Sequence, residues 1–106
     1  MQSTHIPERL AALRSLMAEH QLDAFVVSKE VNLHYFSGFR GDDTMLVITP
    51  QKAFLVTDSR YTEQARQQAP LYELVEQTAG LLLRTSEVLI TENAKAIGFE
   101  GNALTY

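Results

Sequence analysis

The stretch that organises this chain lies between two strongly apolar runs. It reads Asn32-Leu33-His34-Tyr35-Phe36-Ser37-Gly38-Phe39-Arg40-Gly41-Asp42-Asp43. The apolar runs on either side would anchor a loop to a sheet, so we expect Arg40, Asp42 and Asp43 to be exposed at its tip. Exposed loop residues on a rigid support often carry function, although a charged loop is more commonly a solvated turn.

The composition is that of a single folded domain. The chain has 106 residues, of which 45% are hydrophobic and 21% are charged, and this is enough for one layered core. Its net charge of −4 argues against binding to a phosphate backbone. The absence of cysteine excludes disulfides and thiolate metal sites. No apolar run is long enough to span a membrane and no signal peptide is evident, which is compatible with a cytoplasmic protein.

Apolar spacing and turn residues divide the chain into alternating helices and strands. The pattern predicts helices over about 4–20, 28–36, 59–68 and 81–89, and strands over 24–27, 45–49, 53–57, 71–76 and 96–99. Thr4, Ser28 and Asp58 are the expected helix caps. The short linker at Pro50 requires an antiparallel hairpin, and 71–76 has the charged, partly alternating pattern of an edge strand. The alternation predicts an α/β fold: a mixed sheet with one antiparallel pair and helices on both faces.

Two of the predicted helices carry apolar side chains for the core. The first places Leu10, Leu13, Leu16 and Met17 at helical spacing. The second has four residues available to pack, namely Val31, Leu33, Tyr35 and Phe36.

The sequence lacks the usual catalytic motifs. No two of the three histidines, His5, His20 and His34, have the spacing of a helical metal site, and no nucleophile elbow or phosphate-binding glycine loop is present. Five carboxylates could converge to hold two divalent ions for phosphodiester cleavage: Asp23, Asp42, Asp43, Asp58 and Glu63. We favour local roles for them instead, because Asp23 precedes a strand, Asp58 fits a helix cap and Glu63 lies on a solvated helical face.

Two motifs at the proper separation resemble the N-terminal domain of the creatinase and prolidase family. The first is the segment from Asn32 to Phe39, where the family has an Asn and then Tyr-Leu-Thr-Gly-Phe, with Phe36 and Ser37 as conservative departures. The second is Asp58-Ser59-Arg60-Tyr61, which matches an Asp-x-Arg-Tyr segment that opens a helix. The late segment from Ile97 to Glu100 also fits, so the resemblance covers nearly the whole chain.

The resemblance implies a ribonuclease H-like α/β layer in residues 1–106, forming one domain of a larger metallopeptidase that acts on Xaa-Pro bonds. In that family a separate C-terminal domain of the pita-bread fold holds two divalent ions, which would be manganese, cobalt or zinc, and no metal or cofactor site is expected in this chain. The implied partners are that catalytic domain, a homodimer partner and a proline-containing peptide, with no nucleic acid and no membrane. The chain alone would be inactive.

In the family, a loop of this domain approaches the active site of the neighbouring subunit. Gly38, Phe39 and Arg40 correspond to that loop, and Asp42 and Asp43 lie just beyond it. Arg40, Asp42 and Asp43 would limit substrate length and read a peptide terminus at the active site of the neighbouring subunit, and Phe39 would supply an apolar wall. We interpret the remaining motif residues as structural: Asn32, Tyr35 and Gly38 in the first motif, with Asp58 as a cap, Arg60 in an ion pair and Tyr61 in packing.

Two other interpretations remain open. The chain could be an independent module that binds a small ligand or a protein, or its parent could be a creatinase-like amidinohydrolase. The segment from Glu100 to Tyr106 leaves the last predicted strand and resembles a lead into another element. We therefore expect the chain to be a piece of a longer protein, whose downstream sequence would decide between these interpretations.

Overall fold

A five-stranded mixed sheet forms the centre of the computed structural model, which describes residues 5–100. The strands are β1 (Ala24–Val27), β2 (Met45–Ile48), β3 (Ala53–Thr57), β4 (Glu73–Glu76) and β5 (Ile97–Phe99). Their spatial order is β4-β3-β2-β1-β5. The predicted hairpin is confirmed as the antiparallel pair β2–β3, and β4 is an edge strand as predicted. A second antiparallel pair, β1–β2, was not predicted, while β3–β4 and β1–β5 are parallel.

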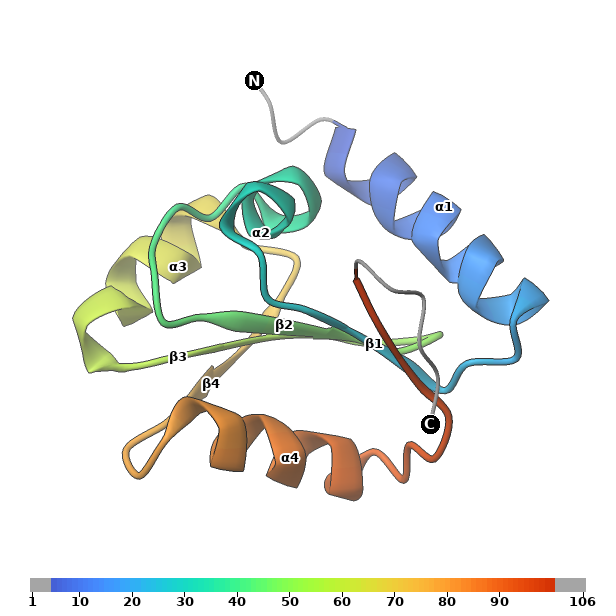
Figure 1. Ribbon diagram of the computed structural model, residues 1–106. Coiled ribbons are helices and arrows are strands. Elements are labelled where there is room, and N and C mark those ends of the chain that lie inside the picture. Colours follow the sequence, from blue (N-terminus) through green and yellow to red (C-terminus); the bar gives the residue numbers. More distant parts are fainter. Residues whose placement is uncertain (1–4, 101–106) are drawn as a thin grey trace.

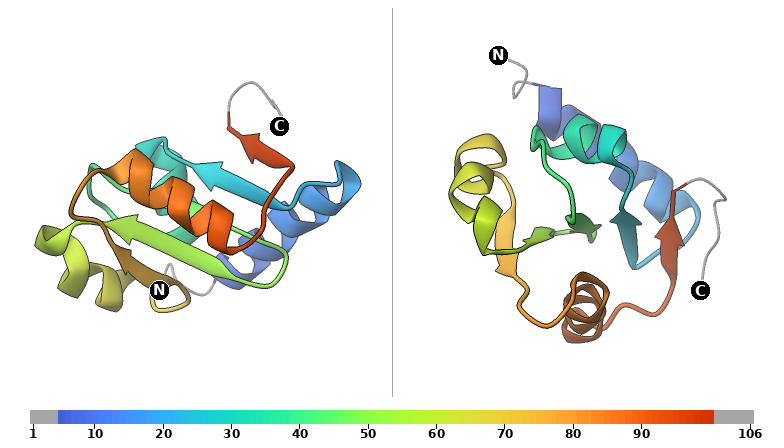
Figure 2. Two further views of the ribbon diagram at one scale, coloured as in Figure 1. Left: turned by 90° about the horizontal axis from the view of Figure 1, so that it is seen from below. Right: turned by 60° about the vertical axis from the view of Figure 1, so that its left-hand side comes forward.

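Helices cover both faces of the sheet, as the sequence predicted. Residues 5–100 contain four α-helices: α1 (Ile6–Glu19), α2 (Glu30–Ser37), α3 (Thr62–Gln68) and α4 (Leu81–Thr91). Figure 1 shows α1, α2 and α3 above the sheet and α4 below it, and the two views in Figure 2 confirm this layering. No helix between residues 5 and 100 has the length and apolarity needed to cross a membrane.

Strand alternation divides the core into two layers, because successive side chains point to opposite faces of a sheet. On β2, Leu46 and Ile48 pack under α1 and α2, whereas Val47 packs toward α4. On β3, Leu55 belongs to the first layer and Phe54 to the second. The central strands β1, β2 and β3 therefore read as nearly continuous apolar runs, as expected when both faces of a sheet are buried.

The helix starts differ from the sequence prediction at two places. Helix α2 begins at Glu30 after Lys29, and Ser28 makes no cap; its hydroxyl donates instead to Glu100. Asp58 does cap as predicted, but the first turn after it, Ser59–Tyr61, is a 3₁₀-helix that leads into α3. The predicted cap Thr4 and the segment 101–106 lie outside the described residues.

Some apolar side chains that were expected to pack are exposed. Leu16 on α1 and Val31 on α2 face solvent, and Tyr35 is half exposed. Helical spacing alone cannot separate a residue on the buried stripe from one at its margin.

Candidate functional site

The loop that follows α2 begins with a glycine that the structure requires. Gly38 has φ +85° and its N–H donates to the carbonyl of His34 at 2.8 Å, which ends α2 in the left-handed conformation favoured by glycine. A Cβ at Gly38 would lie 2.9 Å from the carbonyl oxygen of Gln68. The loop therefore passes directly against the end of α3.

Two glutamines of α3 hold the backbone of Arg40. The Arg40 N–H donates to Gln68 Oε1 at 3.0 Å, and Gln64 Nε2 donates to the Arg40 carbonyl. Gln64 Nε2 also donates to Gln68 Oε1 at 3.1 Å, so the two glutamines support each other. These bonds fix the backbone of Arg40 at the loop tip while its side chain stays exposed.

Phe39 anchors the loop from inside the core. Its side chain has no exposed area, and its ring meets the Tyr61 ring edge-to-face with centroids 5.8 Å apart. The Phe39 N–H donates to the Ser37 hydroxyl at 3.0 Å. Gly41 crosses the same ring so closely that a Cβ there would lie 2.7 Å from it. In this structure Phe39 thus has no surface to offer as the predicted apolar wall, and we assign it the role of an anchor.

Both aspartates of the loop are tied to the second motif. The Tyr61 hydroxyl donates to Asp42 Oδ1 at 2.6 Å, and Arg60 Nη2 pairs with Asp43 Oδ2 at 3.2 Å. Arg60 also binds Asp58 through Nε and Nη2, at 3.0 and 2.7 Å. The two motifs, which are distant in sequence, form one polar cluster at the surface.

The ionisation of this cluster follows from its hydrogen bonds. The Arg60 side chain lowers the pKa of Asp58, and Asp58 in turn raises the pKa of Arg60. The hydrogen bond to Asp42 raises the pKa of the Tyr61 hydroxyl. Arg60 is the ion-pairing residue and Asp58 the cap that the sequence predicted, and Tyr61 packs against Phe39 as expected.

Arg40 is exceptional among the arginines of residues 5–100. The other five each make a side-chain hydrogen bond or ion pair within the domain: Arg9, Arg14, Arg60, Arg66 and Arg84. No such contact holds the Arg40 guanidinium in this part of the chain. It borders an open depression of about 390 Å³ together with Glu30, Val31 and His34. Burial first, and then the charges of Arg40 and Arg9, lower the pKa of His34.

The other end of α2 is held by Glu100. Its Oε1 accepts from the Ser28 and Lys29 backbone N–H groups at 2.5 and 2.8 Å, and its Oε2 accepts from Asn32 Nδ2 at 2.7 Å. Burial raises the pKa of Glu100, but these hydrogen bonds outweigh it and hold the pKa below its usual value. Asn32, the first motif residue, therefore links α2 to the end of β5.

Tyr35, another motif residue, lies against α1. The Arg9 guanidinium sits 4.2 Å from the centroid of the Tyr35 ring, and Arg9 Nη1 donates to the Tyr35 carbonyl at 2.9 Å. The tyrosine thus connects α1 with the helix that leads into the loop.

The five carboxylates do not converge on one site. Asp23 accepts from the N–H groups of Lys95 and Ala96 at 2.8 and 2.9 Å, and Glu63 pairs with Arg66 on the same helix. Between residues 5 and 100 no group of three or more acidic or histidine side chains is placed to hold a metal ion. The described part of the chain therefore does not fit the two-metal centre expected of the parent.

Three contributors to the site were not predicted from the sequence. Gln64 stands close to the second motif, but its side chain gives no signal of a contact with Arg40. Gln68 and Glu100 reach the loop and α2 only because the fold brings them there. The sequence clues came only from the family resemblance, in which Gln64 follows the second motif and Glu100 belongs to the late segment.

The fold and the braced loop show what class of protein this is. It is a small three-layer α/β domain with a rigid, charged surface loop. The family model of the creatinase/prolidase N-terminal domain matches residues 9–106, and the chain belongs to this family. It is 35% identical over 98 residues to the uncharacterized peptidase YqhT of Bacillus subtilis, covering 92% of this chain and 28% of that protein. A probable Xaa-Pro aminopeptidase P of Laccaria bicolor is 42% identical over 74 residues, covering 58% of this chain and 11% of the fungal protein.

Solved structures show the same fold. An Xaa-Pro dipeptidase from Bacillus anthracis superposes with a TM-score of 0.86 at 30% identity, over 95% of this chain and 28% of that one. The N-terminal domain of the cytoplasmic peptidase PepQ from Mycobacterium tuberculosis gives 0.80 at 32% identity, over 88% and 72%. The chain thus spans little more than a quarter of the length of the B. subtilis relative and of the B. anthracis enzyme.

Proposed function

We propose that this chain is the noncatalytic N-terminal domain of a cytoplasmic, metal-dependent Xaa-Pro peptidase. In this proposal it contributes to dimerisation and shapes substrate access at the active site of the neighbouring subunit. The names of the relatives support the peptidase class over a creatinase-like amidinohydrolase, because those cited above are peptidases, dipeptidases or aminopeptidases. The metal ions would be held by polypeptide outside residues 5–100.

The observation that carries the access role is the guanidinium of Arg40, which has no hydrogen-bond or ion-pair partner among residues 5–100 and stands on a fixed backbone. Asp42 and Asp43 are engaged with Tyr61 and Arg60, so we assign them to bracing the loop. Arg40 is left as the group that meets substrate. A guanidinium binds a carboxylate through parallel hydrogen bonds, and more strongly where water is partly excluded. Arg40 would therefore recognise the C-terminal carboxylate of a short peptide and so limit substrate length.

The test compares Arg40→Ala with the unchanged protein in the longer polypeptide that carries this domain. The substrates are an Xaa-Pro dipeptide, an Xaa-Pro-Yaa tripeptide and their C-terminal amides. For the free acid of the preferred length we expect kcat/KM to fall about 10- to 100-fold, the range for losing one charge-assisted contact. The amides, which lack the carboxylate, should be affected little.

Arg66→Ala is the matched control, because Arg66 is also an exposed arginine but pairs with Glu63 on its own helix. It should leave the kinetics unchanged. Equal kcat/KM values for Arg40→Ala and the unchanged protein on peptides of every length would refute the access role. Binding without hydrolysis in any metal-loaded form of the longer protein would instead favour an independent binding module.

A further inference from the structure

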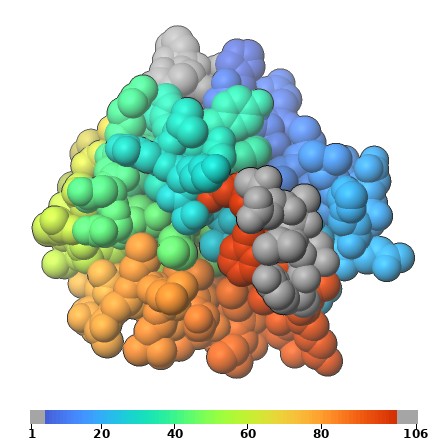
Figure 3. Space-filling model, in the orientation of Figure 1, coloured from blue at the N-terminus to red at the C-terminus, as the bar shows by residue number. Residues whose placement is uncertain are grey.

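The depression beside Arg40 has a second charged group, which the proposed function does not use. Glu30, Val31 and His34 line the depression from one side of α2, because residues three and four positions apart share a helical face. Arg40 borders it from the loop. In the space-filling view, α2 and the loop after it lie beside each other on the face toward the viewer (Figure 3). The depression is therefore formed where the helix meets the loop that it positions.

The two charges of the depression are opposite and unpaired. The exposed carboxylate of Glu30, in the first turn of α2, makes no hydrogen bond or ion pair with any residue from 5 to 100. The same holds for the Arg40 guanidinium. The two groups line one depression without pairing with each other, so space remains between them. A ligand that carries both a carboxylate and a cation can occupy this space and pair with both groups.

The other two lining residues suit a short aliphatic chain. Val31 is 74% exposed, and covering its side chain with apolar groups removes apolar surface from water. His34 lies one helical turn further along α2. Burial first, and then the charges of Arg40 and Arg9, lower the pKa of His34, which keeps its ring uncharged at neutral pH. An uncharged ring does not repel a cation that pairs with Glu30.

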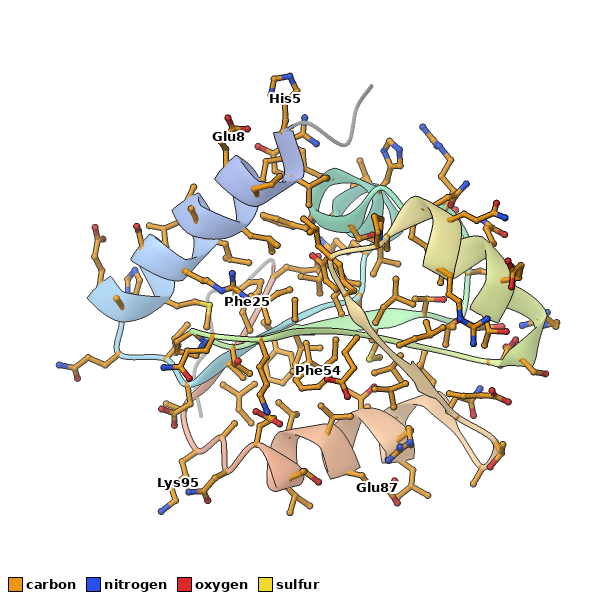
Figure 4. The ribbon with its side chains drawn as sticks, turned by 180° about the vertical axis from the view of Figure 1, so that it is seen from behind. His5, Glu8, Phe25, Phe54, Glu87 and Lys95 are labelled. Carbon is orange, nitrogen blue, oxygen red and sulfur yellow. The ribbon has the colours of Figure 1, made fainter. Side chains whose placement is uncertain are left out.

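The other charged side chains nearby or shown in Figure 4 do not compete with Glu30 for such a cation. Asp42 and Asp43 are engaged with the second motif. Glu87 and Lys95 lie on the far side of the sheet, beside α4 (Figure 4). Among residues 5–100, Glu30 is the one acidic side chain that borders the depression.

We propose that the depression binds the C-terminal residue of an Xaa-Pro-Yaa tripeptide and favours lysine or arginine at Yaa. Arg40 binds the terminal carboxylate, Val31 contacts the aliphatic part of the Yaa side chain, and Glu30 pairs with its cation. The inference rests on the proposed function, which places the substrate terminus at Arg40, and deepens it by naming the substrate class. An exposed ion pair contributes little, so the preference for a basic Yaa is modest.

The test compares Xaa-Pro-Lys with Xaa-Pro-norleucine as substrates of the longer polypeptide that carries this domain. Norleucine has a similar aliphatic chain but lacks the ammonium group. We expect kcat/KM to be about two- to tenfold higher for the lysine peptide, the range from an exposed ion pair to one ordinary hydrogen bond. Glu30→Gln should remove this preference and leave the norleucine peptide unaffected. Glu30→Lys should reverse it, so that Xaa-Pro-Glu is favoured over Xaa-Pro-Lys.

Glu87→Gln is the matched control. Glu87 is also an exposed carboxylate on a helix, but it points away from the sheet on the side of α4 (Figure 4). The preference for the lysine peptide should persist in this variant. Because both carboxylates are exposed, far-UV circular dichroism should show an unchanged fold for every variant.

Equal kcat/KM values for the lysine and norleucine peptides would overturn the inference. A lysine preference that survives Glu30→Gln would overturn it too, because another group would then select the cation. Hydrolysis of dipeptides alone would also overturn it, since no Yaa side chain would reach the depression. In each case Arg40→Ala still tests the access role on free-acid peptides, so a failure of this inference is distinguishable from a failure of the proposed function.

Discussion

Gly38→Ala should destabilise the domain more than any surface substitution in the loop. Alanine at φ +85° costs about 1–2 kcal/mol, because its Cβ crowds the following carbonyl in the left-handed conformation. The same Cβ would meet the Gln68 carbonyl oxygen at 2.9 Å. That neighbour is backbone, so the loop and α3 must move apart, and overpacking of this kind costs about 1–3 kcal/mol.

The two contributions together predict a loss of about 2–5 kcal/mol in the free energy of unfolding. A domain of this size has a total of about 5–15 kcal/mol, so a fold with a lower melting temperature should survive. At about 4–8 °C per kcal/mol for a domain of 60–100 residues, Tm should fall by about 8 °C or more.

Urea unfolding followed by far-UV circular dichroism measures this loss as a lower midpoint with an unchanged slope. Gly38→Asn separates the two causes. Asparagine tolerates the left-handed conformation but carries the same Cβ, so it should recover only the backbone part of the cost. A midpoint for Gly38→Ala within error of the unchanged protein would refute both the predicted strain and the close packing of the loop on α3.

The remaining predictions concern buried and partly buried polar groups. Thr44 Oγ1 donates to the Asp42 carbonyl and lies 2.9 Å from Thr57 Oγ1, so Thr57 must donate to Thr44. Thr44→Val should therefore cost about 1 kcal/mol more than Thr57→Val in urea unfolding, because it leaves the Thr57 hydroxyl buried without an acceptor; equal losses would contradict this donor order. The pKa of Glu100 is lowered in the folded state, so its stabilisation is present above the unfolded pKa of about 4.5 and is lost as pH falls through the folded value. Glu100→Gln should remove that part of the acid dependence of Tm, and an unchanged profile below pH 4.5 would contradict the assignment.

Local patterns were sufficient to predict most of the secondary structure. Uninterrupted apolar runs at 24–27, 45–48 and 53–57 are central strands, and Pro50 does lie in a hairpin turn. The exposure of Arg40 at the loop tip was also predictable, because short-range apolar and polar spacing reports burial. The errors fall where burial depends on a neighbouring element. Leu16 fits the helical spacing of α1, yet the core does not reach that side of the helix.

The partners inside the site were not predictable in the same way. Arg60 was expected to form an ion pair, but only the structure shows that its partners include Asp43, 17 residues away. Phe39 was expected at a substrate surface, because a motif shows that an aromatic ring belongs there without showing which way the ring points. Its burial follows from the position of Tyr61 in the folded domain.

The sequence by itself determined the family, the alternation of helices and strands, and the place of the charged loop between two buried runs. These are properties of residue type and short-range spacing, because the spacing between residues sets which of them share a face of a helix or strand. The tertiary structure decided which loop charges are braced, which one has no partner among residues 5–100, and which side chain ties the start of α2 to the end of β5. Glu100 reaches Ser28 across 72 positions of sequence only because β5 pairs beside β1. Strand order is set by the packing of the whole sheet, and no local pattern encodes it.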